Sequence, residues 1–88
     1  MEFFIEKERI YAADEFGNMV AEVTFPAAGG MADINHTFVD ESLRGHGTAA
    51  HLMEMAYAEI CRQGNQPVFS CSYAKKWAEK NNLPEGKS

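Results

Sequence analysis

A short segment with two glycines, Arg44–Ala49, carries the clearest chemical pattern in this sequence of 88 residues. A strand-like stretch, residues 31–39, precedes this segment, and a helix-like stretch begins inside the segment and continues after it. The first N–H groups of a helix have no partner inside the helix, and the helix dipole adds about half a positive charge there. Because Gly45 and Gly47 have no side chains, an anion can approach the backbone closely. The pattern predicts a phosphate site, with Arg44 at its edge.

Better-known sites for phosphates and metals are excluded by spacing. The sequence has no Gly-x-x-x-x-Gly-Lys-Ser/Thr loop, and Ala50 stands where a dinucleotide fingerprint needs its third glycine. His46 and His51 are five residues apart, which is not the helix-face spacing of metal ligands. Cys61 and Cys71 have no metal-type spacing and are too few for a disulfide scaffold. We therefore expect no metal ion.

Two further side chains could take part in proton transfer or nucleophilic attack. A histidine can gain or lose a proton near neutral pH, so His36 could act as a base. Cys71 directly precedes a predicted helix, whose N-terminus favours the reactive thiolate. Both residues also fit a purely structural role, since most free cysteines are small buried hydrophobes and a histidine on an apolar face is commonly a core residue. Cys61, in the apolar stripe of the first helix, is expected in the core.

These residues must be positioned by strands and helices in a definite order. Alternating apolar and polar residues predict three strands, joined by two turns into an antiparallel meander. Spacings of three and four residues predict a long helix after them, and Ser72 is the expected N-cap of a second helix. In order, the predicted segments are strand 3–13, turn 14–18, strand 19–25, turn 26–30, strand 31–39, helix 46–63, strand 68–71 and helix 73–81.

The connection through the long helix constrains the sheet. Strand, helix and strand form a right-handed crossover, so strands 31–39 and 68–71 should run parallel. The order β-β-β-α-β-α then gives an α/β (α+β) fold, with a mixed four-stranded sheet covered by two helices. Ligands of such folds commonly bind where neighbouring strands end at an opening of the sheet.

The segment Arg44–Ala49 resembles the signature Gln/Arg-x-x-Gly-x-Gly/Ala of the GNAT superfamily, the acyl-CoA-dependent N-acyltransferases. With residues 34–39 before it and 67–74 after the helix, it resembles the short, single-domain subgroup over most of the chain. The resemblance implies that this loop holds the pyrophosphate of acetyl-CoA, and that the acyl arm inserts where the two parallel strands splay apart. The cofactor-binding residues that it implies are Val39, Arg44, Gly45, His46, Gly47, Thr48 and Ala49.

The same resemblance implies an N-acetyltransferase that moves an acetyl group to an amine of a small molecule or a protein. Aminolysis of a thioester needs a base, an oxyanion donor and a general acid. Cys71 and His36 are the candidate catalytic residues, and Tyr73 resembles the tyrosine that protonates the thiolate of coenzyme A in many members. Phe38 stands where the short subgroup often carries a glutamate, so the acidic residues 40–41 would have to replace that carboxylate.

Other functions stay open beside this one. Full GNAT domains carry N-terminal helices and a C-terminal strand pair that shape the acceptor site, and these 88 residues have room for neither. A non-catalytic acyl-CoA-binding or protein-interaction module is therefore the alternative, and the glycine segment could also be a plain tight turn. A homodimer could complete the acceptor cleft from a neighbouring subunit. No residue set specifies the acceptor or the length of the acyl chain.

Composition and charge narrow the class of protein. The sequence is 45% hydrophobic and 24% charged, which is typical of one folded domain over residues 1–88. Residues 1–41 hold two basic and nine acidic side chains, and residues 42–88 hold six and four, so an anionic cofactor suits the second half. The net charge of −5 argues against nucleic acid, and no apolar run reaches the roughly 18 residues that cross a bilayer. We expect a cytoplasmic protein with no membrane partner and a loose tail at 84–88.

Overall fold

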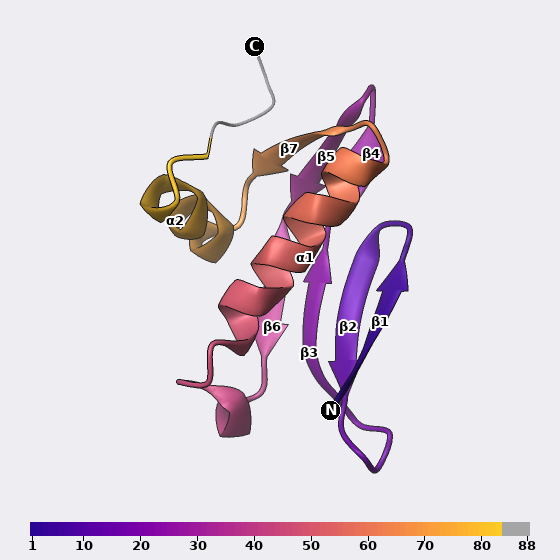
Figure 1. Ribbon diagram of the computed structural model, residues 1–88, viewed down its shortest axis with the longest axis vertical. Helices are drawn as coiled ribbons and strands as arrows, with labels where there is room; N and C mark the ends of the chain where they lie inside the picture. The colour runs from indigo at the N-terminus through magenta and orange to yellow at the C-terminus, as the bar shows by residue number, and fades with distance from the viewer. Residues whose placement is uncertain (84–88) are drawn as a thin grey trace.

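The computed structural model describes residues 1–83, in which strands come first and two helices flank the last strand (Figure 1). The predicted α+β fold class is confirmed, with two sheets in place of one. In chain order the elements are β1 (Glu2–Glu6), β2 (Arg9–Ala13), β3 (Met19–Thr24), β4 (Ala27–Ala28), β5 (Met31–Ile34), β6 (His36–Val39), the 3₁₀ helix η1 (Glu41–Leu43), α1 (Thr48–Arg62), β7 (Gln66–Phe69) and α2 (Ser72–Lys80).

The strands form two sheets, one antiparallel and one mixed. Strands β1, β2, β3 and β6 form an antiparallel sheet in that order, and β4, β5 and β7 form a second sheet. Strand β5 runs parallel to β7, as the crossover through α1 predicts. In Figure 1, α1 lies across one face of the sheets and α2 lies beside α1, next to β7. The helices thus form one layer over the strands.

The predicted single strand over residues 3–13 is wrong. The chain turns back at Lys7 and Glu8, so that β1 and β2 form a hairpin in which Glu6 pairs with Arg9. The alternation of apolar and polar residues continues through this turn without the glycine, proline or asparagine that usually marks one. A second hairpin joins β4 to β5 through Gly29 and Gly30, which both have positive φ, as a two-residue turn requires. The predicted loose tail at 84–88 lies outside the described residues.

The predicted strand 31–39 is broken at Asn35, and the break opens the sheet. Before it, β5 pairs with β7, and after it, β6 pairs with β3. The carbonyl oxygen of Ile34 accepts hydrogen bonds from the N–H groups of both Ser70 and Cys71, at 3.2 and 3.0 Å. The strand β7 therefore ends beside β5, while β6 continues without it. This is the predicted splay of the parallel strands.

Both predicted helices are present, with small differences at their starts. Helix α2 begins at Ser72 with Cys71 as its N-cap residue, one position before the expected cap. Cys61, expected in the core, is exposed on α1. None of the helices in the described part of the chain is long and apolar enough to cross a membrane. The core lies between α1 and the sheets, and its buried residues are Ile10, Ala12, Ala21, Val23, Phe25, Ala32, Ile34, Leu52, Met53, Ala56, Ile60, Phe69, Ala74 and Ala78.

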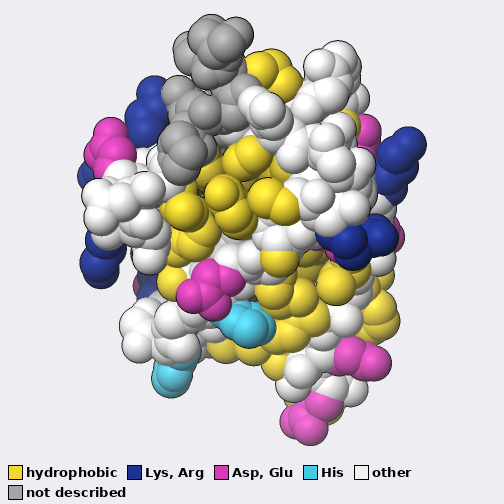
Figure 2. All heavy atoms as spheres, turned by 45° about the horizontal axis from the view of Figure 1, so that its top comes forward, with side chains coloured by type: hydrophobic (Ala, Val, Ile, Leu, Met, Phe, Trp, Pro, Cys, Tyr) yellow, Lys and Arg dark blue, Asp and Glu magenta, His cyan; other side chains and the backbone are white. Residues whose placement is uncertain are grey.

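The surface on the helix side is mixed in character. Hydrophobic side chains reach the surface in the middle of this side, while Lys and Arg side chains stand at its margins (Figure 2). Two rings on this side illustrate the packing, because Phe3 of β1 and His51 of α1 meet edge to face with centroids 5.2 Å apart. Helix α1 is thereby fixed to the edge strand as well as to the core.

Candidate functional site

A cleft of about 370 Å³ lies where the end of β6, the loop after it and the starts of α1 and α2 meet. Its walls are mostly backbone and small side chains, so a chain-like or flat ligand can lie against the main chain. The lining residues are Thr37, Val39, Leu43, Arg44, Gly45, Gly47, Thr48, Ala49, Ala50 and Tyr73.

The loop into α1 is held by its own hydrogen bonds. Asp40 accepts from the N–H and the hydroxyl of Ser42, at 3.0 and 2.6 Å, and these bonds hold the pKa of the Asp40 carboxyl below its ordinary value. The N–H groups of Arg44 and His46 donate to the carbonyl oxygens of Glu41 and Leu43, both at 3.2 Å. The η1 turn is therefore an ordered support for the glycine segment that follows.

The glycine segment presents backbone donors to the cleft. Gly45 and Gly47 have φ of 84° and 75°, which L side chains adopt only at a cost, and a Cβ added at either would meet no atom within 4 Å. The first helical bond of α1 runs from the N–H of His51 to the carbonyl oxygen of Gly47. The N–H groups of Gly47 and residues 48–50 donate to no acceptor within residues 1–83. These donors, with the exposed Arg44 beside them, can hold an anion.

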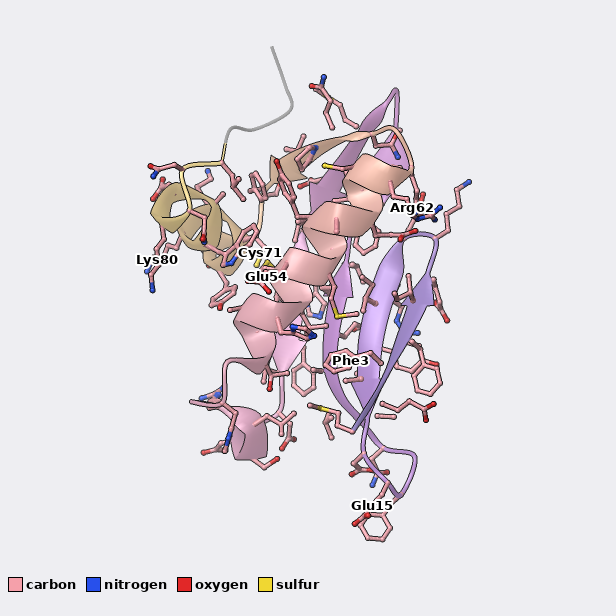
Figure 3. All side chains as sticks on the ribbon, in the orientation of Figure 1. Phe3, Glu15, Glu54, Arg62, Cys71 and Lys80 are labelled. Carbon is pink, nitrogen blue, oxygen red and sulfur yellow. The ribbon has the colours of Figure 1, made fainter. Side chains whose placement is uncertain are left out.

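Cys71 lies at the junction of β7 and α2, close to the same cleft (Figure 3). Its thiol donates to the hydroxyl oxygen of Thr37, 3.6 Å away, and Thr37 lines the cleft. Partial burial raises the pKa of the thiol, but the N–H groups of Ala74 and Tyr73 and the hydroxyl and N–H of Thr37 outweigh it. The pKa of Cys71 is therefore held below its ordinary value, which favours the nucleophilic thiolate.

The structure brings most of the residues singled out in the sequence to this cleft. His46 is the exception in the glycine segment, since it is exposed and does not line the cleft. Tyr73, on the first turn of α2, forms part of the wall and is 39% exposed. The other residues of the predicted set that line the cleft are Val39, Arg44, Gly45, Gly47, Thr48 and Ala49.

His36 lies on the opposite face of the sheet. Thr37 and Val39 of β6 point toward the cleft, so the alternation along a strand turns His36 and Phe38 away from it. The side chain of His36 is 55% exposed, and its Nε2 lies 3.6 Å from a carboxylate oxygen of Glu22. The apolar face on which His36 was expected ends at Asn35, because one added residue moves all later side chains to the other face.

Three lining residues were missed in the sequence: Thr37, Leu43 and Ala50. Thr37 could have been found, because a strand that turns Val39 toward a ligand must turn Thr37 the same way. Leu43 depends on the η1 turn, whose only signal in the sequence is the Asp-x-Ser cap of Asp40. In residues 1–83, no three His, Cys, Asp or Glu side chains come together as a metal site would need.

Comparison with known proteins gives one family. The family model described as GCN5-related N-acetyl-transferase matches residues 9–85, which include the whole glycine segment and both helices. Among curated proteins, Protein NATD1 from Gallus gallus is 31% identical over 55 residues, or 62% of this chain. The match covers 50% of that relative, so the chain spans about half the length of the curated relatives it matches.

Solved structures show the same fold. The NMR structure of a GCN5-like protein from Staphylococcus aureus is 27% identical and has a TM-score of 0.74, covering 92% of this chain and 80% of that one. The crystal structure of nourseothricin acetyltransferase is 18% identical, with a TM-score of 0.63 and coverage of 83% and 46%, which shows a shared fold alone.

Proposed function

This chain belongs to the family of GCN5-related N-acetyltransferases, and we propose that it binds acetyl-CoA in the cleft and transfers the acetyl group to an amine. One observation carries the proposal: unpaired backbone donors at the start of α1 line the same cleft as Thr37, which contacts the Cys71 thiol. A ligand with an anionic end and a reactive thioester at the other fits this arrangement.

The two ends of acetyl-CoA would be held by different groups. The N–H groups of residues 47–50 and the guanidinium of Arg44 would bind the pyrophosphate, since donors at a helix start favour negative charge. The acyl arm would lie along β6. One edge of β6 pairs with β3, and the other edge is not covered by β7, because β7 ends at the splay. An extended ligand can bond to such an edge as an added strand does. Thr37 and Val39 would face it.

In the direct route, the amine attacks the thioester carbonyl within the splay. The C–N bond forms as the C–S bond breaks, the amine loses a proton, and the departing thiolate gains one. Tyr73 is our candidate for the donor of that proton, because its phenol belongs to the cleft wall on the first turn of α2. His36 lies on the other face of the sheet, so this geometry gives it no part in the step.

A second route passes through Cys71. Its thiolate would attack the carbonyl and displace the thiol of coenzyme A, leaving a thioester on Cys71 that the amine then cleaves. The lowered pKa of Cys71 and its contact with Thr37 favour this route. It predicts ping-pong kinetics and an acetylated enzyme when no amine is present.

The function is tested by release of coenzyme A thiol with a panel of amines, including a lysine peptide and a polyamine. Gly45→Ala should lower turnover at sub-saturating acetyl-CoA by about tenfold or more, whereas Gly17→Ala, which adds a Cβ at the same φ of 84° in the β2–β3 turn, should keep it. Cys71→Ala separates the two routes, because only the second needs the thiol. Binding of acetyl-CoA without turnover for any amine would make the chain a binding module, and no binding at millimolar ligand would contradict both.

A further inference from the structure

The four-stranded sheet has one face that no helix in residues 1–83 covers, because α1 and α2 both lie on the other side (Figure 1). Large hydrophobic side chains point out of this open face. Phe4, Met19 and Phe38 are 36%, 41% and 38% exposed. Apolar groups of this size on one sheet face commonly mark a contact surface.

The strand register orders the side chains of the open face into rows. Residues directly opposite each other in antiparallel strands share a face. The pairings connect Phe4 to Tyr11, Tyr11 to Glu22 and Glu22 to Phe38, which makes one row across all four strands. The neighbouring row across β1, β2, β3 and β6 consists of Glu6, Arg9, Thr24 and His36.

The centre of the open face is already charge-paired. Arg9 stacks over the ring of Tyr11 at 4.1 Å and bonds to the Glu22 carboxylate. The same guanidinium reaches Glu6 at 3.5 Å and the sulfur of Met19 at 3.4 Å. The face thus offers aromatic surface around a charge-paired centre with no excess of positive charge, which suits neither a membrane nor a nucleic acid.

We propose that a second copy of this chain covers the open face, so that the protein forms a two-fold dimer through the outer faces of two sheets. A two-fold axis along the strands, between β2 and β3, places β1 of one copy over β6 of the other. Phe4 then meets Phe38 of the second copy, and Glu6 meets His36 of the second copy. Aromatic rings meet rings and an acid meets a histidine, so the face is complementary to itself.

The size of the face fits a weak dimer. Strands about 4.8 Å apart that rise ~3.4 Å per residue give a face of roughly 20 by 17 Å. Because side chains project from the face, its accessible area is larger than this flat area. The contact would bury on the order of 1,000 Å² in total, at the small end of specific interfaces. A dissociation constant in the micromolar range is therefore expected.

The dimer also has a consequence for the site, and this consequence alone rests on the proposed function. His36 and Phe38 belong to β6, which borders the opening left by β7. Strand β1 of the second copy would lie beside that opening, on the face away from the cleft. It would supply a wall on the side from which an amine can approach.

Sedimentation equilibrium of the full chain between about 5 and 500 µM tests the dimer without reference to activity. The wild type should move from its monomer mass of 9.8 kDa toward twice that value as the concentration rises. Phe38→Arg should stay monomeric at concentrations at least tenfold above those at which the wild type dimerises. Phe16→Arg is the matched control, because Phe16 is 80% exposed in the β2–β3 turn, and it should behave as the wild type does.

A charge swap tests the pairing itself in folded protein, as checked by circular dichroism. Glu6→Arg and His36→Glu should each weaken the dimer, and the double variant should regain it in part, because the acid and the base have exchanged places. A wild type that stays monomeric throughout would overturn the proposal. So would a Phe38→Arg variant that still dimerises, or a double variant weaker than both single ones.

Discussion

The two ends of α1 differ in their backbone hydrogen bonds. We call the C-terminal end closed, because the residues that follow it bond to its last carbonyl groups, and the N-terminal end open, because its first N–H groups have no partner in residues 1–83. Past the C-terminal end, the N–H groups of Gly64 and Asn65 return to the carbonyl oxygens of Cys61 and Ile60, both at 3.0 Å. This is a Schellman motif, and it satisfies backbone acceptors inside the chain. At the other end, no side chain caps the helix at Gly47, and the first donors face the cleft. A glycine with positive φ stands at both ends, near φ of 80°.

Helix α2 repeats this difference on a smaller scale. At its end, Asn82 has φ of 56°, and the N–H groups of Asn82 and Leu83 donate to the carbonyl oxygens of Glu79 and Ala78. At its start no side-chain cap bond forms, and the Cys71 thiol lies beside the hydroxyl of Thr37 and the N–H groups of Tyr73 and Ala74. The helix ends that hydrogen-bond within the chain stabilise the fold, and the helix starts that carry no side-chain cap are available to a ligand.

The largest expected effect comes from adding one methyl group to the glycine loop before α1 or to the glycine after its end. Gly45→Ala and Gly64→Ala both put a Cβ at φ above 80°, where a side chain costs about 1–2 kcal/mol. Their losses of stability in urea unfolding should be similar. Only Gly45→Ala should weaken acetyl-CoA binding, by about tenfold or more, because its Cβ would hold the phosphate away from the backbone donors, and each charge-assisted hydrogen bond lost is worth ~1.5–3 kcal/mol. Equal affinity of the two variants would mean that the ends do not differ in function.

The next effect concerns the open start of α2. In a Cys61→Ser background only Cys71 can react, and its lowered pKa predicts fast alkylation by iodoacetamide near pH 7. Thr37→Val keeps the shape but removes the hydroxyl, so the pKa should rise and the rate at pH 7 should fall several-fold. The rate measured against pH should give a higher midpoint for the variant. An unchanged midpoint would show that the Thr37 hydroxyl does not affect the Cys71 thiol.

A smaller effect is expected from the closed end of α1. Arg62 and Gln63 hydrogen-bond to the Glu59 carboxylate and lower its pKa to about 2. A lowered pKa stabilises the fold above the ordinary pKa of a glutamate, and this contribution is lost as the pH falls toward 2. Glu59→Gln should therefore lower Tm near pH 7, with the difference fading toward pH 2. Glu54→Gln, on the exposed face of α1, is the control and should change Tm little at either pH.

The smallest effect is expected at the closed end of α2. Asn82→Ala should cost about 0.5–1 kcal/mol of unfolding free energy, because alanine tolerates positive φ less well than asparagine. The change should leave acetyl-CoA binding and Cys71 alkylation as they are. Urea unfolding and the alkylation assay check the two parts. A changed alkylation rate would show that the two ends of α2 are coupled.

The fold class and the loop were predictable because their signals are local. The spacing of apolar residues predicted α1 and α2, and Gly45 and Gly47 stood at the strand-to-helix junction where positive φ is needed. The hairpin at Lys7 and Glu8 was missed because its turn has none of the usual turn residues. Only the pairing of distant strands decides such a turn, and periodicity does not report pairing.

The face of β6 was beyond prediction for a related reason. His36 and Val39 were both assigned to the site, although residues three apart in a strand point to opposite faces. The break at Asn35, where the chain leaves one sheet for the other, decides which of the two faces the cleft: Val39 lines it and His36 does not. That change of partner follows from tertiary packing. The side chains that it turns toward the cleft follow from simple alternation.

The most direct measurement is a nitrogen–proton NMR spectrum of the labelled chain during titration with acetyl-CoA and, separately, with pyrophosphate. The amide signals of Gly47 and residues 48–50 should shift most with both ligands, because these groups are the donors. The signals of Gly64 and Asn65, whose N–H groups are bonded within the chain, should stay in place. No shift at millimolar ligand, or shifts centred on residues 64–65, would contradict a ligand site at the open end of α1.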